Sequence, residues 1–244
     1  MALWKKIVLI GVTMLVVGYL VGSAVWVHLR SNSVVCNTLS IEIQDESKRQ
    51  YLNRSELAAL LKQKHIYPIG QLMDSVKVRE IEAVVESHPM VRHAECFART
   101  GGEVVVRLSQ RIPLLRVVTG AETYFVDTDH TRMPIRESVK DKVMLVEGEV
   151  GQRMACEEIA DLVLLIRTDK YWRGRISKVR VRNPRYVELI EQPRGNIIIL
   201  GECRDVKEKL SRLKTYYENG AAELDLPEYR EYDLRYADQV IGRK

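Results

Sequence analysis

Ser211 and Lys214 are one pair of residues whose types and spacing could support covalent chemistry. A serine followed three positions later by a lysine is the nucleophile-and-base arrangement that opens the signature of penicillin-binding proteins. That chemistry also needs Ser-Asp-Asn and Lys-Thr-Gly motifs, and neither occurs in the sequence. Because the pair falls inside an amphipathic helical pattern, we expect two ordinary helix residues and no catalytic site.

Histidines and carboxylates also come close together at two places. Asp127, Asp129 and His130 could hold a metal, but side chains that bond their own backbone are typical of a turn, which is the interpretation we favour. His88 and His93 flank the start of a predicted strand without metal-ligand spacing, so we expect surface histidines. No Gly-x-Ser-x-Gly, P-loop or dinucleotide fingerprint occurs in the sequence. We therefore predict a protein that is not an enzyme and binds no cofactor or metal.

The cysteines indicate neither a metal site nor a disulfide. There are four, and they form no Cys-x-x-Cys pair, so the ligand spacing of a zinc site is missing. In an oxidising compartment, four cysteines could pair in three ways. Nothing in the sequence requires a disulfide, and single buried thiols are the default expectation for Cys36, Cys96, Cys156 and Cys203.

The N-terminal region carries a long apolar run, residues 7–29, that contains no Lys, Arg, Asp or Glu. A helix needs about 20 apolar residues to cross the hydrocarbon layer, so the run predicts a single transmembrane helix in the lipid bilayer. A cleavable signal peptide is the alternative, but its apolar region is about 7 to 15 residues long. Two lysines before the run, against one arginine close after it, favour a cytoplasmic tail at residues 1–6 and an exported remainder.

The net charge of +5 does not indicate nucleic-acid binding, because acidic and basic residues are interspersed. The densest basic stretch alternates: Lys178, Arg180 and Arg182 face one side of a predicted strand, and Val179 and Val181 face the other. We expect a solvated strand face. Binding to an acidic partner or to anionic headgroups is the alternative.

After a linker at residues 30–37, residues 38–113 have the pattern of a compact β-α-α-β-β unit. Asn53 and Glu56 resemble a capping box that opens the first helix, and Pro89 closes the second. Residues 114–240 predict a mixed α+β domain with a largely antiparallel sheet, followed by a tail at residues 241–244. The fold class is therefore α+β with two small sheets.

The first unit has further recognisable positions. Pro89, Val91 and Ala94 stand around the start of its hairpin, whose second strand runs into Gln110-Arg111-Ile-Pro113. With these residues the unit resembles a POTRA domain, and more narrowly that of the bacterial cell-division family FtsQ/DivIB. That family usually carries an acid where Gln110 stands.

The second half resembles the same family. The turn at residues 127–130 has His130 where the family has Gly, and "YDLRYADQV", residues 232–240, closely matches the family's last strand. The order of anchor, POTRA domain, mixed domain and terminal Asp-Leu-Arg-Tyr is more specific than any single motif.

This resemblance implies a non-enzymatic division scaffold of the cytoplasmic (inner) membrane at the septum. A segment of FtsB, bound with FtsL, would dock on the last strand, and other division proteins would bind the POTRA domain. Only "ADQVIGRK" follows Tyr236, so no later strand is expected to cover this one, although an earlier strand could do so. The resemblance implies that the last strand is an exposed edge. The resemblance assigns Arg235 to an acid of the partner and Tyr236 to an aromatic anchor. Leu234 and Tyr232 complete the expected partner-binding set.

Two other classes of protein remain open at this point. One is a POTRA-type secretion or assembly factor, although the strands lack the repeated lipid-facing alternation of a membrane barrel. The other is a membrane-tethered enzyme of cell-wall metabolism.

Overall fold

The computed structural model describes residues 2–31, 34–44, 46, 50–139, 142–220 and 229–244, with the side chains of the first helix described from residue 10 to residue 26. Residues 1 and 32–33, and the side chains at both ends of the predicted transmembrane helix, therefore lie outside the described residues. The chain divides into two units, one up to Gln110 and one from Arg111.

Helix α1, Ala2–Ser31, is continuous and contains the apolar run. Its described apolar side chains are largely exposed: Ile10, Val12, Met14, Leu15, Val16, Val17, Tyr19, Leu20, Val21, Val25 and Trp26. Judged over the described residues, no helix combines the length and the hydropathy needed to cross a membrane.

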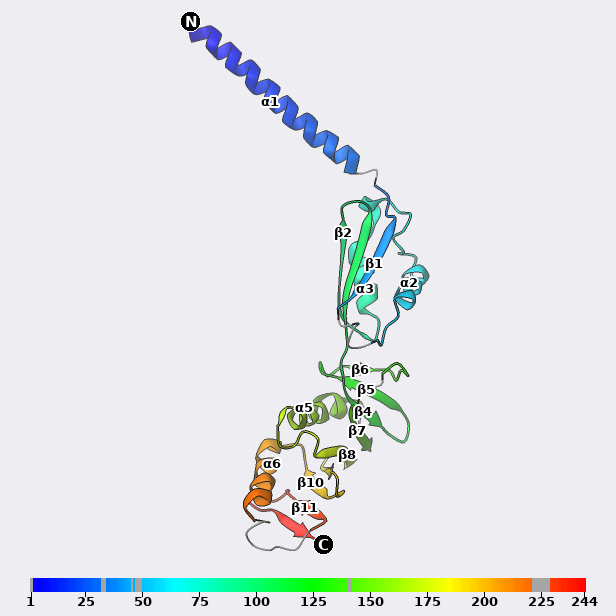
Figure 1. The fold of residues 1–244 in the computed structure, drawn as a ribbon, viewed down its shortest axis with the longest axis vertical. Helices are drawn as coiled ribbons and strands as arrows, with labels where there is room; N and C mark the ends of the chain where they lie inside the picture. Colours follow the sequence, from blue (N-terminus) through cyan, green and yellow to red (C-terminus); the bar gives the residue numbers. More distant parts are fainter. Residues whose placement is uncertain (1, 32–33, 45, 47–49, 140–141, 221–228) are drawn as a thin grey trace. The chain divides into compact units, whose positions relative to one another are not determined.

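The first unit contains a three-stranded sheet in the order β1-β3-β2, with β1 parallel and β2 antiparallel to β3. Helix α3 packs against β2, and helix α2 packs against α3 (Figure 1). The β-α-α-β-β order matches the expectation. Its elements are β1 (Thr38–Ile43), α2 (Arg54–Gln63), a 3₁₀ turn η1 (Met73–Ser75), α3 (Val78–Glu86), β2 (Val91–Arg99) and β3 (Glu103–Gln110).

Two polar side chains fix the ends of these elements. Asn53 caps α2 as predicted, but it accepts its hydrogen bond from the N–H of Ser55 at 3.0 Å and not from that of Glu56, as a capping box would. Gln110 is 2 % exposed, and its Oε1 accepts from the N–H groups of Tyr51 (2.9 Å) and Leu52 (3.1 Å). The amide oxygen thus performs, without a buried charge, the acceptor role that a carboxylate could perform there.

The second unit contains a single nine-stranded sheet in the order β12-β11-β10-β9-β8-β7-β4-β5-β6. The described chain thus has two sheets, but the expectation that both are small was wrong, because this one has nine strands. Its described pairings are mostly antiparallel, as expected. The strands are β4 (Pro113–Val118), β5 (Thr123–Asp127), β6 (Arg132–Met133), β7 (Met144–Gly148), β8 (Ile176–Asn183), β9 (Tyr186–Glu191), β10 (Ile197–Gly201), β11 (Glu231–Asp233) and β12 (Ile241–Arg243).

Helices lie along one side of this sheet (Figure 1). They are α4 (Gln152–Met154), α5 (Ala160–Thr168) and α6 (Val206–Thr215), with single π-helical turns η2 (Ala155–Ile159) before α5 and η3 (Tyr216–Gly220) after α6. Their apolar side chains pack with those of the strands around Trp172, which is 1 % exposed. The hydrophobic core of this unit therefore lies between its sheet and these helices.

The basic face of β8 carries cross-strand ion pairs. Glu147 on β7 accepts from Lys178 (3.1 Å) and Arg180 (3.2 Å), and Glu188 on β9 accepts from Arg182 (2.7 Å). Glu188 is only 2 % exposed, so the expected solvated face is in part a buried ion-pair ladder. Alternation along one strand predicted the face, but it could not reveal acids that adjacent strands supply.

Candidate functional site

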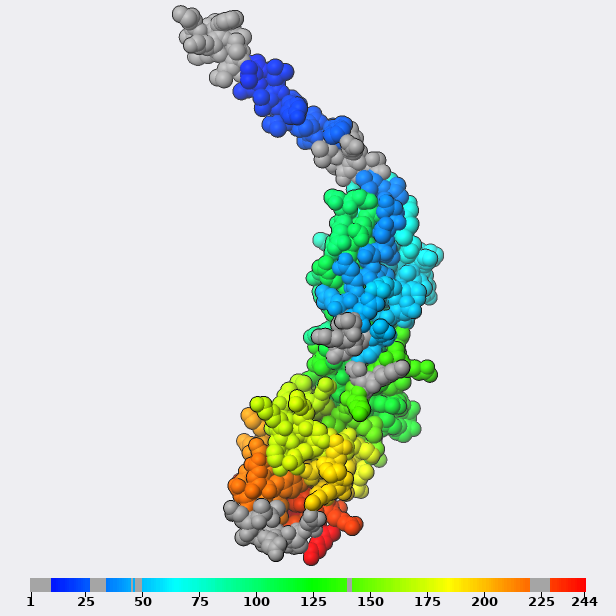
Figure 2. Space-filling model, viewed as in Figure 1, coloured from blue at the N-terminus to red at the C-terminus, as the bar shows by residue number. Residues whose placement is uncertain are grey.

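The segment predicted as one last strand contains two short strands. After β11 the backbone bends, with Asp238 at φ +56, and residues 241–243 return as β12, antiparallel to β11. The expectation that no later strand covers β11 was therefore wrong, and residues 241–244 are not simply a tail. In Figure 2 the C-terminal residues, in red, lie at the surface of this unit. An aspartate tolerates a positive φ better than most residues, which permits the bend.

Tyr232 and Leu234, two of the expected partner-binding residues, lie in the core. Tyr232 is 6 % exposed and Leu234 is not exposed. The ring of Tyr232 meets that of Tyr217 edge-on, with 5.2 Å between centroids. Their side chains therefore stabilise β11 from the inside, and a docking role can fall only on their neighbours.

Arg235 forms an ion pair within its own strand end. Its Nε lies 2.9 Å from Asp233 Oδ1, and its Nη2 lies 2.7 Å from Oδ2. Arg243 on β12 also reaches Asp233 Oδ2, at 3.3 Å. Burial opposes ionisation of Asp233, but the hydrogen bonds and charge of Arg235, together with the charge of Arg243, hold the pKa of its carboxyl below the ordinary value. The carboxylate is thus charged although it is fully buried.

Gly201, at the end of β10, makes room for this arrangement. Its φ is +70, and a Cβ there would lie 2.7 Å from Cγ of Arg235. The guanidinium of Arg235 also lies over the ring of Tyr186, 5.2 Å from the centroid. A glycine is therefore needed at position 201, both for the positive φ and to leave space for the Arg235 side chain.

Tyr236 is 49 % exposed and follows directly. Its main chain is held by Arg212 of α6, whose Nη2 donates to the carbonyl oxygens of Leu234 (3.3 Å) and Tyr236 (3.1 Å). Sequence reasoning missed Arg212, because nothing in a helical arginine indicates that it will bind a distant strand end. This contact fixes the backbone that presents the exposed ring.

The first unit has two sheet edges, and they differ. On β2, the outward N–H groups of Ala94 and Cys96 donate to Glu86 (3.1 Å) and Glu82 (2.9 Å) of α3. Side-chain carboxylates thus occupy two of the donors that an added strand would use.

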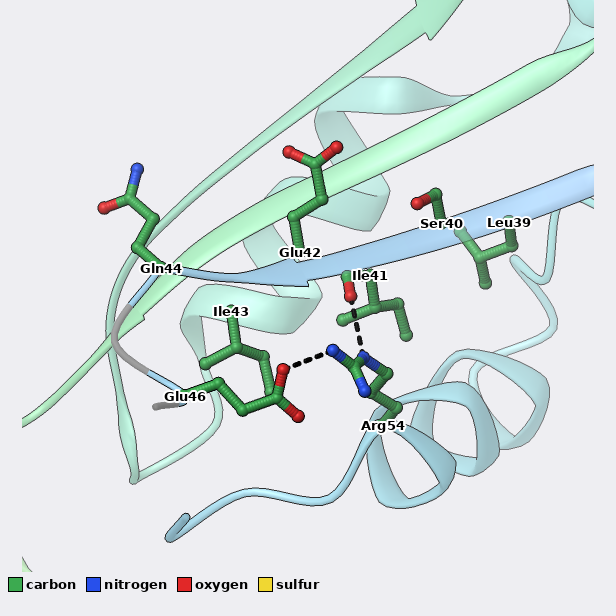
Figure 3. Close-up of a pocket in the computed structure, with 8 residues that line it drawn as sticks. All are labelled: Leu39, Ser40, Ile41, Glu42, Ile43, Gln44, Glu46 and Arg54. Atoms are coloured by element: carbon green, nitrogen blue, oxygen red, sulfur yellow. Dashed lines mark hydrogen bonds and ion pairs between the residues drawn. The ribbon is translucent and has the colours of Figure 1, made fainter. Parts of the chain in front are cut away.

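The β1 edge is more accessible. Gln44 N–H donates to Leu108 of β3, so the alternate residues Leu39, Ile41 and Ile43 direct their backbone groups to the other side. A hollow runs along this edge beside Arg54, which donates from Nε to the Ile41 carbonyl at 3.0 Å and pairs with Glu46 (Figure 3). Within the described residues, the N–H groups of Ile41 and Ile43 have no side-chain acceptor.

The residues considered for catalysis do not assemble into a site. Lys214 lies 3.8 Å from Glu218 in the π-helical turn that follows α6, and Ser211 is exposed. Asp127 accepts from the N–H groups of Asp129 (2.9 Å) and Thr131 (2.7 Å), which is the turn chemistry that we predicted. Across the described ranges, no group of three His, Cys, Asp or Glu side chains could hold a metal ion.

The histidines and cysteines also have structural surroundings. His93 is exposed as expected, but His88 is not a surface residue: it is 8 % exposed, its Nδ1 accepts from Met90 N–H at 3.2 Å, and its Nε2 lies 3.3 Å from Glu56. All four cysteines are free. Burial raises the pKa of Cys96 and of Cys203 to about 12, so both thiols stay protonated and unreactive at neutral pH.

A POTRA-type unit followed by a mixed-sheet domain whose surfaces offer strand edges defines a class of binding proteins. Comparison with family models agrees: residues 34–109 match the POTRA-like domain, and residues 112–243, more than half of the chain, match the model described as FtsQ/DivIB, C-terminal related. The chain belongs to the FtsQ/DivIB family. It is a cell-division-related POTRA protein, and domains of these kinds are typically non-catalytic. No curated protein matches the sequence.

Proposed function

We propose that this protein is a non-enzymatic scaffold of the division machinery, held in the cytoplasmic membrane and concentrated at the septum. The observation that carries the proposal is the FtsQ/DivIB-related domain in which an exposed tyrosine, Tyr236, follows the short strand β11 near the edge of the sheet. Aromatic residues on a rigid backbone are typical interface anchors.

The membrane anchor is residues 7–29. The absence of charged residues in this run supports it, as do the exposed apolar side chains of α1 between Ile10 and Trp26. With residues 1–6 in the cytoplasm, both units would be exported.

The docking partner at the C-terminal edge of the sheet is an FtsB/FtsL-like pair of single-pass coiled-coil proteins. Arg235 uses Nε and Nη2 on Asp233, while its Nη1 makes no hydrogen bond with any described residue. A carboxylate of the partner can therefore approach Nη1 without breaking the internal pair. Tyr236 supplies the apolar contact beside it.

Photo-crosslinking in intact cells tests this assignment. A photoreactive residue at position 236 should give an adduct with the FtsB-like protein of the same organism. The same residue at Arg116, exposed on β4 of the same sheet, should give none. An abundant, folded variant that yields no adduct from position 236 would remove the C-terminal edge as the docking site.

The POTRA unit binds other division proteins through the edge of β1. Among the described residues, the outward N–H groups of Ile41 and Ile43 have no side-chain acceptor, although the carbonyls of both residues accept hydrogen bonds. On β2, by contrast, Glu82 and Glu86 already occupy two outward donors. A probe at Leu39 should therefore crosslink to a division protein, and a probe at Arg99 on β2 should not. Equal yields at both positions would contradict the preference for β1.

A further inference from the structure

The most exposed large apolar side chains of the POTRA unit lie together at one end of it. Val35 is 46 % exposed, Ile69 42 % and Leu72 49 %. Among the described residues of this unit that follow α1, no other large apolar side chain is so exposed. Apolar residues scattered singly over a surface need no explanation, whereas a group of them is typical of a surface that a membrane or another protein covers. We call these three residues the apolar patch.

Backbone hydrogen bonds hold the apolar patch together. Val35 and Leu72 are opposite each other in an isolated antiparallel bridge, so their side chains lie on the same side of it. The N–H of Gly70 donates to the carbonyl of Cys36 at 2.8 Å, which places the neighbouring Ile69 next to this bridge. Cys36 itself is 1 % exposed, so the segment is fixed in the core of the unit.

The apolar patch is also tied closely to the proposed membrane anchor, on which this inference rests. Val34 already belongs to the unit, since its carbonyl accepts from the N–H of Met73 at 2.9 Å. Helix α1 ends at Ser31. Consecutive Cα atoms are about 3.8 Å apart, so the Cα atoms of Ser31 and Val34 can be separated by about 11 Å at most.

This tether keeps the patch near the lipid headgroups. Two helical steps from Leu29, the end of the apolar run, to Ser31 add about 3 Å, so Val34 lies within about 14 Å of Leu29. The headgroup layer on each side of a bilayer is about 5 to 8 Å thick. Val34 can therefore lie no more than about 9 Å beyond the headgroups.

Cationic and aromatic side chains come shortly before the patch in the chain. The Nζ of Lys62 lies 4.8 Å from the centroid of the Tyr67 ring. Lys64 is exposed and forms no hydrogen bond or ion pair with any described residue. Residues 62–73 contain no Asp or Glu. Lysines that extend toward phosphates, and tyrosines at headgroup level, are typical of protein segments at a membrane surface.

We propose that the apolar patch rests on the membrane that holds α1. Its three side chains enter the headgroup layer on the exported side, and Lys62 and Lys64 lie near lipid phosphates. Strand β1 begins at Thr38, three residues after Val35, so this contact would also set the height at which the β1 edge starts. A partner of that edge would then need to carry its binding segment close to its own membrane-spanning part.

Quenching by lipids of a tryptophan placed in the patch tests the contact. The full chain carries Trp4→Phe and Trp26→Phe, so that the anchor gives no signal, and the parent that keeps only Trp172 gives the background. It is reconstituted into vesicles of phosphatidylethanolamine and phosphatidylglycerol, with or without bromine on the upper part of the acyl chains. Leu72→Trp should lose emission in the brominated vesicles.

The control position lies at the other end of the unit. The N–H of Asn37 donates to the carbonyl of Gly102, so the patch is near the start of β3. Ser87 is exposed and shortly precedes Val91, which pairs with Gln110 at the end of β3. The two ends of this strand are about 24 Å apart. Ser87→Trp should therefore keep its emission in the brominated vesicles.

A charge placed in the patch gives a second test. In the Leu72→Trp chain, Ile69→Asp should reduce the quenching, because a carboxylate opposes entry into an apolar layer. Ile135→Asp is the matched control: Ile135 is 41 % exposed, almost as much as Ile69, but it belongs to the second unit. This substitution should leave the quenching unchanged.

The outcomes separate this inference from the proposed anchor. If the chain does not float with the vesicles in a density gradient, the anchor fails and this inference fails with it. If the chain floats but position 72 is no more quenched than position 87, the membrane contact is wrong and the anchor stands. Emission from position 72 that shifts to shorter wavelength without quenching would show that protein, and not lipid, covers the patch.

Discussion

Arg235 donates two hydrogen bonds to the carboxylate of Asp233, from Nε to Oδ1 at 2.9 Å and from Nη2 to Oδ2 at 2.7 Å. Only one residue separates the two in the chain. This pair aligns the end of β11 with the exposed ring that follows. It also places a fully buried carboxylate beside the proposed docking surface.

Asp233→Asn should destabilise the second unit by about 1 to 3 kcal/mol, the usual cost of weakening hydrogen bonds to a buried group. Trp172 reports on this unit alone once Trp4 and Trp26 are replaced by Phe. Urea unfolding followed by its fluorescence measures the change. Glu231→Gln, on the same strand but only partly buried, should cost much less. Equal effects of the two variants would contradict the special role of the pair.

Acid should weaken the same unit. The pKa values of Glu147 and Asp233 are both below the ordinary values of 4.5 and 3.8, because hydrogen bonds from basic neighbours outweigh the opposing effect of burial. A depressed pKa in the folded state stabilises the fold above the unfolded pKa, and this contribution is lost as pH falls through the folded pKa. We expect a steady free energy of unfolding from neutral pH down to about pH 5, and a decline below it. A combined Glu147→Gln and Asp233→Asn variant should show a flatter profile.

Tyr236→Ala should reduce partner affinity by about 2 kcal/mol or more, a typical hot-spot effect, without changing unfolding. Tyr232→Ala should instead lower the free energy of unfolding, by about 3 to 5 kcal/mol, because it removes an aromatic side chain from the core. Calorimetric titration and urea unfolding of both variants give the comparison. A folded Tyr236→Ala protein with unchanged affinity would exclude the ring from the interface.

Gln110→Leu should destabilise the POTRA unit by about 1 to 3 kcal/mol, because the N–H groups of Tyr51 and Leu52 lose an acceptor in a buried position. Gln110→Glu restores an acceptor oxygen and should cost less at neutral pH. Thermal unfolding followed by circular dichroism ranks the two variants. If Gln110→Glu is the less stable of the two variants, the cost of burying its charge outweighs the gain from its acceptor oxygen.

Gly201→Ala should displace Arg235 and weaken docking, because the added Cβ meets the arginine side chain at a φ of +70. The backbone strain alone is of the order of 1 kcal/mol. Gly120→Ala, with nothing within 4 Å of its Cβ, should leave both stability and binding unchanged. Partner affinity measured for the two variants tests whether the position of Arg235 matters.

The sequence predicted the POTRA unit well, because its signals are local: an apolar stripe in α3, the Asn53 cap and alternation through the hairpin of β2 and β3. It also predicted the turn at Asp127 from side-chain chemistry alone. These features depend on residues close together in the chain.

The site was harder to predict because it is built from distant segments. β12 is only three residues long and follows a bend, so it has too few alternating positions to be recognised. Arg212 and Gly201 meet the last residues of the chain only after folding. The alternation of Tyr232, Leu234 and Tyr236 suggested a single face, yet the strand ends at Asp233 and only Tyr236 is exposed.

The carboxylates of Glu82 and Glu86 on the N–H groups of β2 also bear on contacts between copies of this chain. An uncapped nine-residue edge strand would recruit the same strand of a neighbouring copy and begin an aggregate. With those two donors occupied, the β2 edge offers fewer free N–H groups to the same edge of another copy. The acidic side chains of α3 thereby protect this edge against strand pairing between copies.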